Sequence, residues 1–439
     1  MTESESTTIF DNPSGDAITR RNRFVLPVAR VALLGLWFIA TLQIARILGP
    51  AAFGIYWLCQ NAIRIVTGCV SDPLDMAVMR EAPIYFRSQP SIAMELIRSA
   101  FWLRITAGVL CSLAAAAVPG VVSWLIFDSP DYKLLALFTA LGIVGDLLLR
   151  SSLGFFQASE RFGSFMLVDM LWQLSRVVTV AVLWLCGALT MQAAIILYVA
   201  APFAAFALAI MLFPAEVRKP VLPHPDRLRG VLHYSKWMAA VTVMAVIAER
   251  LDIFMLKHFR SDHEVGIYGG AMALALIPDF LNSSIQTVLS PRIAPAFADG
   301  QFIHLRNSYL KLAVPAGLLA AVIAWLIGGP VIKAFLSTRY VESIDAFKVL
   351  ILATLFNAVM TPLSSPLVSY VRPKLAMIVS GLSLVIVGGV GVVLIPRYGV
   401  MGASMLILIT RVIVGSILFV IADRLARIGR AALNEKAHG

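Results

Sequence analysis

Long apolar runs separated by short polar segments dominate the 439-residue chain, and twelve of the runs have spanning length. Crossing a hydrocarbon layer about 30 Å thick takes about 20 helical residues. Strands are excluded as spans, because an open sheet edge in lipid leaves backbone groups unpaired. The pattern therefore predicts an all-α polytopic membrane protein. The predicted spans are 25–47, 52–76, 98–124, 132–157, 162–187, 191–213, 234–257, 265–289, 307–330, 344–368, 374–396 and 400–423.

Composition and charge agree with this class. Hydrophobic residues make up 59% of the chain and charged residues only 14%, whereas soluble domains are about half apolar and a quarter charged. The segments placed inside hold 21 Lys and Arg, against 5 in the outside loops. This asymmetry predicts that both termini face the cytoplasm. The net charge of +11 is scattered over short loops, so nucleic acid is not an expected partner.

One segment of the sequence occurs in two similar copies. The tripeptide GIY occurs at 54–56 and 266–268, and REAP at 80–83 matches RIAP at 292–295, both at an offset of 212. Over the ungapped pairing of these segments, nine of 36 positions are identical. This joint match indicates internal duplication.

The duplication predicts how the chain is divided. The repeated segments fall in the second and eighth spans, so the two halves enter the membrane in the same orientation. Such parallel repeats are typical of transporters that work by alternating access. We expect two pseudo-symmetric six-helix bundles. The predicted parts are a disordered cytoplasmic tail 1–24, a bundle 25–213, a basic Pro-rich linker 214–231, a bundle 232–425 and a basic tail 426–439.

Polar side chains follow one face of each repeated span. Such stripes cannot face lipid, so they line a shared cavity or make only hydrogen bonds between helices; the duplication favours a cavity. In the eighth span the stripe is Asp279, Asn282, Ser283, Gln286 and Thr287. In the second it is Gln60, Arg64, Thr67, Ser71 and Asp75.

Arginines gather near the predicted midplane, where the planar guanidinium suits phosphate oxygens. Structural pairing is the alternative for Asp146 with Arg150, and for Arg176 with its neighbours Asp169 and Gln173. The predicted substrate-binding residues are Arg64, Arg150, Arg176, Arg250, Arg411, Thr67, Ser71, Asn282, Ser283 and Gln286. The predicted ion-coupling residues are Asp146, Glu249, Asp252 and Asp279.

No pattern indicates catalysis. The chain has no GxxxxGK[ST] or GxSxG motif and no Cys or His at metal-ligand spacing, so we expect no catalytic residue, metal or cofactor. The outside loops are too short for a catalytic domain, which disfavours a membrane oligosaccharide polymerase or ligase. A structural role without transport would leave the duplicated stripes unexplained.

Three segments carry a family resemblance. They are ARILGPAAFGIYW at 45–57, ERLDIFMLKHFRSDHEVGIYGGA at 249–271 and VRPKLAMIVSGLSLVIVGGVGVVLIPRYGVMGAS at 371–404. In order and spacing the chain resembles the polysaccharide-biosynthesis flippases of the Wzx type. Their superfamily also holds MATE-type multidrug exporters and peptidoglycan-precursor flippases, all with two six-helix halves.

The resemblance implies an ion-coupled carrier, not an enzyme, that moves an undecaprenyl-pyrophosphate-linked oligosaccharide across the bacterial inner membrane. Asp252 matches the acid of the family's seventh span. Implied partners are this lipid, the bilayer, and the polymerase and chain-length components of the same pathway. A MATE-type antiporter is the main alternative, although midplane acids would suit it better than arginines. The peptidoglycan-precursor branch usually has two further spans, which this chain lacks.

Overall fold

Helices make up almost all of the described protein. The computed structural model describes residues 33–159, 161–214, 217 and 239–438, and no strand occurs among them. The predicted all-α class is confirmed. The predicted tail 1–24 lies outside these residues, as does nearly all of the predicted linker 214–231.

Seven of the described helices are long and apolar enough to cross a membrane, or eight if one bent pair counts as a single span. This number supports a multi-pass membrane protein, and the full count of twelve stays a prediction. Two further helical stretches are Leu33–Leu48 and 239–248. The named helices are α3 Pro50–Ser88, α4 Pro90–Ala117, α5 Pro119–Phe127, α6 Lys133–Ala158, α7 Phe162–Leu185, α8 Met191–Leu212, α10 Leu251–Phe259, α11 Asp262–Ala275, α12 Ile277–Ala298, α13 Phe302–Phe335, α14 Ser343–Val371 and α15 Pro373–His438.

Several helix boundaries differ from the predicted spans. Helix α3 continues to Ser88, so the REAP segment is helical and not a loop. The predicted span 98–124 is divided at Val118, because Pro119 begins α5 and its ring cannot continue α4. The label α15 covers both of the last two predicted spans, which are two helices separated by a sharp kink at Gly399, with φ +53°. A Cβ atom on Gly402 would overlap the carbonyl oxygen of Leu394, so the backbone turns back on itself there. Residues 426–438, predicted as a tail, extend the second of these helices.

Two predicted spans are broken in the middle. Residues 249–250 form a turn between the helix 239–248 and α10. Helices α11 and α12 meet at Leu276 with a bend of 42°. Pro278, in the first turn of α12, lacks the N–H that a continuous helix would need at this position. The breaks place Arg250 and Asp279 beside irregular backbone.

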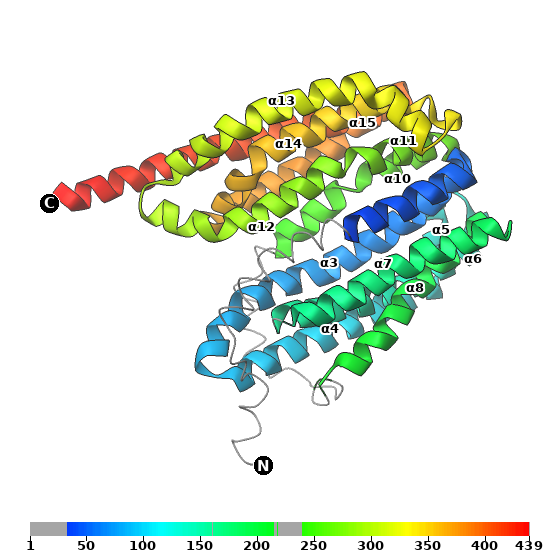
Figure 1. The fold of residues 1–439 in the computed structure, drawn as a ribbon, viewed down its shortest axis with the longest axis horizontal. Helices are drawn as coiled ribbons and strands as arrows, with labels where there is room; N and C mark the ends of the chain where they lie inside the picture. Colours follow the sequence, from blue (N-terminus) through cyan, green and yellow to red (C-terminus); the bar gives the residue numbers. More distant parts are fainter. Residues whose placement is uncertain (1–32, 160, 215–216, 218–238, 439) are drawn as a thin grey trace, which may run out of the picture.

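The helices fall into two groups, which we call the first group (α3 to α8) and the second group (α10 to α15). Figure 1 shows the first group along the lower side of the molecule and the second along the upper side. Contact between the groups is made mainly by α3 and α11, the helices that carry the duplicated GIY.

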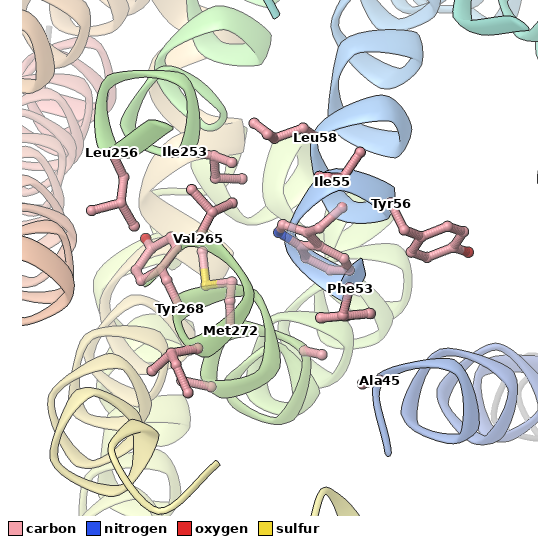
Figure 2. Packing of buried hydrophobic residues seen from close by; sticks show 14 of the residues in the cluster. Ala45, Phe53, Ile55, Tyr56, Leu58, Ile253, Leu256, Val265, Tyr268 and Met272 are labelled. Carbon is pink, nitrogen blue, oxygen red and sulfur yellow. The ribbon is translucent and has the colours of Figure 1, made fainter. Parts of the chain in front are cut away.

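The two copies of GIY touch each other at what we call the closed end. A Cβ atom on Gly54 would overlap the carbonyl oxygen of Asp262, and one on Gly266 would overlap that of Pro50. Because both positions carry glycine, the backbones of α3 and α11 come into direct contact. A buried apolar cluster drawn from both groups surrounds the crossing (Figure 2).

Further bonds tie the helix Leu33–Leu48 to the second group at this end. The buried Tyr340 hydroxyl donates to the carbonyl of Ala45 at 2.9 Å, and Arg46 Nη1 donates to that of Ala334 at 2.9 Å. Away from the closed end each group has an apolar cluster of its own, around Phe156 in the first group and Leu367 in the second. The groups therefore share a core at one end only.

Candidate functional site

Two adjoining cavities lie between the helix groups, and we call them the aromatic lobe and the hydroxyl lobe. Their volumes are about 550 and 420 Å³. Both are lined by Trp57, Arg250, Leu276, Asp279 and Ser283, so they meet at the broken helices. Because polar and charged side chains from both helix groups converge on this space, it is the candidate binding site.

The aromatic lobe lies against the first group. It is lined by Leu33, Leu34, Trp37, Trp57, Gln60, Asn61, Arg64, Phe165, Asp169, Trp172, Gln173, Tyr198, Arg250, Leu276, Asp279, Phe280, Ser283 and Ser284. The hydroxyl lobe lies mostly against the second group, with Trp57 of α3 at its junction with the aromatic lobe. Its polar lining is Glu249, Arg250, Asp279, Asn282, Ser283, Gln286, Asn357, Ser365, Ser369, Ser380, Ser383, Thr410 and Arg411.

Asp279 and Arg411 neutralise each other in this conformation. Two arginine nitrogens, Nη1 and Nη2, lie 2.8 and 2.6 Å from the two carboxylate oxygens. Asn357 Nδ2 adds a third donor to Asp279 at 3.2 Å. Bidentate pairs of this kind are among the stronger ionic contacts in proteins. An anionic ligand would therefore have to compete with Asp279 for Arg411.

Two other arginines carry no such partner. Arg250 Nη1 donates to Asn61 Oδ1 at 2.6 Å, which links the two helix groups across the cavity. Among the described residues neither Arg250 nor Arg64 has a carboxylate within 4 Å, although the charges of Asp146 and Asp72 act on Arg64 and those of Glu249 and Asp252 act on Arg250. An arginine at a cavity with no carboxylate in direct contact can receive an anion.

Arg176 lies behind the cavity wall. It is 1% exposed and donates to the Tyr56 hydroxyl at 3.2 Å and to Gln173 Oε1 at 3.5 Å. Its guanidinium also lies 5.5 and 5.4 Å from the ring centres of Trp172 and Tyr198, respectively. The predicted direct contact with substrate is therefore not available to Arg176 in this conformation, where it packs against the side chains that form the wall.

Three further predicted substrate-binding residues also lie away from both lobes. Thr67 and Ser71 are fully buried, because they face into the first group where α3 packs on α6. Arg150 pairs with Asp146 at 2.7 Å and with Asp72 at 3.8 Å. The alternative of structural pairing describes Asp146 and Arg150 in this conformation, since each neutralises the other.

The predicted ion-coupling residues occupy different surroundings. Glu249 is exposed and lines the hydroxyl lobe beside Asp279. Asp252 is fully buried near the closed end, where the Tyr268 hydroxyl donates to its Oδ2 and its Oδ1 has no partner among the described residues. Within the described residues no group of three or more His, Cys, Asp or Glu could hold a metal.

Sequence reasoning missed most of the polar wall on α14 and α15. Ser365 and Ser369 are four residues apart, and Ser380 and Ser383 are three apart. Both spacings place a pair on one helical face, a signal that was present in the sequence. The aromatic residues Trp57, Trp172 and Tyr198 had no such signal, because apolar spans contain many aromatic residues.

Solved structures with the same fold are membrane transporters. An inward-facing MATE-family multidrug resistance transporter of the MOP superfamily has a TM-score of 0.71 and 12% identity, covering 92% of this chain and 99% of its own. The lipid II flippase MurJ in an inward closed conformation has a TM-score of 0.72 and 13% identity, with 93% and 90% covered. A MOP-superfamily transporter from Pyrococcus furiosus has a TM-score of 0.64 and 15% identity, with 92% and 96% covered.

At these identities the likeness establishes the fold alone. Among curated proteins, no sequence matches the chain significantly. A family model described as "Polysaccharide biosynthesis protein" matches residues 43–345, which include α3 to α13, most of the aromatic lobe and both copies of GIY. The chain therefore belongs to the polysaccharide biosynthesis protein family, and it has the fold of MOP-superfamily transporters.

Proposed function

We propose that the protein is a flippase that moves an undecaprenyl-pyrophosphate-linked oligosaccharide across the bacterial inner membrane. The observation that carries this proposal is a pair of arginines, Arg64 and Arg250, that line the cavity and have no carboxylate within 4 Å among the described residues. A pyrophosphate would supply the missing negative charge. The family match and the fold support the same reading.

The positive-inside prediction places the closed end outside and the separate apolar cores at the cytoplasmic side. In that orientation the cavity would receive the lipid head group from the inner leaflet. Opening to the other side requires Gly54 and Gly266 to separate and the two groups to meet at their cytoplasmic ends. Both termini would remain in the cytoplasm throughout.

The Asp279–Arg411 pair provides a route to coupling. A pyrophosphate bound by Arg411 displaces the Asp279 carboxylate, which then lacks its counter-charge in a buried site. A proton or another cation taken up by Asp279 restores neutrality, since an unpaired buried carboxylate is costly. Release of the lipid on the far side lets the pair re-form and frees the cation there. The cation thus crosses in the same direction as the lipid, and this route draws energy only from a cation gradient directed outward.

Deleting the gene and profiling extracted polyprenyl lipids by mass spectrometry tests the function. We expect one undecaprenyl-pyrophosphate oligosaccharide to accumulate while surface polymer is lost. Complementation with Arg64→Gln should fail, whereas the exposed, matched Arg397→Gln should restore export. An unchanged lipid pool together with new drug sensitivity would instead identify a multidrug antiporter.

A further inference from the structure

The two lobes differ in the side chains that line them. Six aromatic residues line the aromatic lobe: Trp37, Trp57, Phe165, Trp172, Tyr198 and Phe280. Among the described residues that line the hydroxyl lobe, the only aromatic one is Trp57, which both lobes share. The volumes are similar, so the difference is one of chemistry. The lobes therefore offer a ligand two kinds of surface.

Aromatic faces and amide groups together match a sugar. The C–H bonds on one face of a pyranose ring form a flat apolar patch that packs against aromatic rings, while its hydroxyls need donors and acceptors. The aromatic lobe supplies these at Gln60 and Gln173. A serine-lined wall can bond hydroxyls, but it offers no surface for the apolar face of the ring.

Polar atoms at this wall also lack partners. The indole N–H groups of Trp57 and Trp172, and the side-chain oxygen of Gln60, are buried without a hydrogen bond among the described residues. Buried polar groups are nearly always paired in folded proteins. These atoms are covered in the present conformation, so a ligand reaches them once the side chains of the wall turn. Two donors and one acceptor suit hydroxyl groups, which both accept and donate.

The contacts of Arg176 indicate that the aromatic surface is preorganised before a ligand binds. Its guanidinium is held against the rings of both Trp172 and Tyr198, and its bond to Tyr56 anchors it to α3. The two rings are thereby oriented by a residue that never reaches the cavity. Rings fixed in advance bind with a smaller loss of conformational entropy.

We infer that the aromatic lobe is the subsite for the sugar nearest the pyrophosphate, with the pyrophosphate at the junction of the lobes beside Arg64 and Arg250. The inference rests on the proposed function, and it specifies where in the cavity the sugar and the pyrophosphate of the lipid head group bind. Trp172 and Phe165, from α7, are contact residues in this subsite. Arg176 is a positioning residue.

Binding to purified protein in nanodiscs separates the two parts of the head group. The probes are undecaprenyl pyrophosphate, which carries no sugar, and the glycosylated lipid purified from cells lacking the gene. The dissociation constant of undecaprenyl pyrophosphate divided by that of the glycosylated lipid measures what the sugar contributes to affinity. We expect Trp172→Leu to reduce this ratio by about tenfold and to leave the binding of undecaprenyl pyrophosphate unchanged. Trp172→Phe should keep most of the ratio.

Matched variants decide between the lobes. Phe165→Leu should reduce the ratio like Trp172→Leu, whereas Ser380→Ala with Ser383→Ala in the hydroxyl lobe should not. The subsite is overturned if the serine variant lowers the ratio and the α7 variants do not, or if the wild-type ratio is one. If the wild type binds neither lipid, the proposed function itself fails, and the subsite with it. A wild type that binds both lipids with equal affinity contradicts only the sugar subsite, whereas one that binds undecaprenyl pyrophosphate but not the glycosylated lipid contradicts the proposed function as well.

Discussion

The two copies of GIY are alike in the contact made by their glycines and differ in the contact made by their tyrosines. Gly54 and Gly266 meet in a reciprocal backbone contact, whereas the tyrosines two residues later have partners of opposite charge. Tyr56 accepts from Arg176, and Tyr268 donates to Asp252. Figure 2 shows the two tyrosines pointing away from each other on either side of the crossing.

The difference shows which part of a duplicated segment can diverge. The glycines touch each other's backbone, so any side chain at either position disrupts both halves at once. Each tyrosine points into its own helix group, where a new partner requires only local changes. The two copies thus agree where they touch each other and differ where each meets its own helix group.

The largest expected effect comes from filling the glycine contact. Gly54→Val requires the backbones of α3 and α11 to separate, which opens the closed end, so export should fall at least tenfold, equivalent to about 1.4 kcal/mol or more. In a cysteine-free background, Ile55→Cys should then become reactive to a membrane-impermeant maleimide. Gly388→Val is the control, because nothing lies within 4 Å of its added Cβ. Normal export by Gly54→Val would show that the contact is dispensable.

The two tyrosines should differ when each loses its hydroxyl. Tyr268→Phe removes the side-chain donor of Asp252, a buried carboxylate whose other oxygen has no partner among the described residues, and should cost about 3 kcal/mol of stability. Tyr56→Phe should cost about 1 kcal/mol, because Arg176 keeps Gln173 and two aromatic rings. Thermal unfolding in detergent measures both.

A double variant sharpens this comparison. Asp252→Asn in the Tyr268→Phe background removes the stranded charge, so part of the lost stability should return. Equal losses for the two tyrosine variants, or no recovery in the double variant, would contradict the assignment of opposite roles.

The smallest effect is expected at the exposed edge of the closed end. His258 Nδ1 lies 3.2 Å from Asp128 Oδ1, joining α10 to the end of α5, but the histidine side chain is 57% exposed. Because solvent screens such pairs, His258→Gln should cost at most about 1 kcal/mol. Tyr340→Phe, which loses a buried bond at the same end, should lower the unfolding temperature more. The reverse order would contradict this ranking.

The sequence predicted the helical class, the duplication and part of the cavity. Arg64, Arg250, Asp279 and Gln286 were each predicted at the site, and each lines a lobe. Helical periodicity states which residues share a face, and that was enough to identify the polar stripe on the eighth span. Helical periodicity was not enough for the second span, because its polar residues have different surroundings. Arg64 lines the cavity, while Thr67 and Ser71 are buried in the first group, where α3 packs on α6.

The depth of a charged residue within a predicted membrane span does not reveal which side chains surround it. Arg176 and Arg411 look alike in the sequence, since both are arginines near the middle of apolar spans. One is enclosed by two rings and a tyrosine, and the other lines the cavity in a bidentate pair with Asp279. Their different surroundings come from residues distant in the chain.

The sequence by itself determined the membrane class and the two-fold plan of the chain, because hydropathy and internal repeats depend only on residues in order. The tertiary structure alone decided which charges neutralise each other and which side chains reach the cavity. Those outcomes depend on how α3, α7, α11 and α15 are rotated about their axes against their neighbours. Periodicity along a single helix leaves that rotation open, and packing between helices sets it.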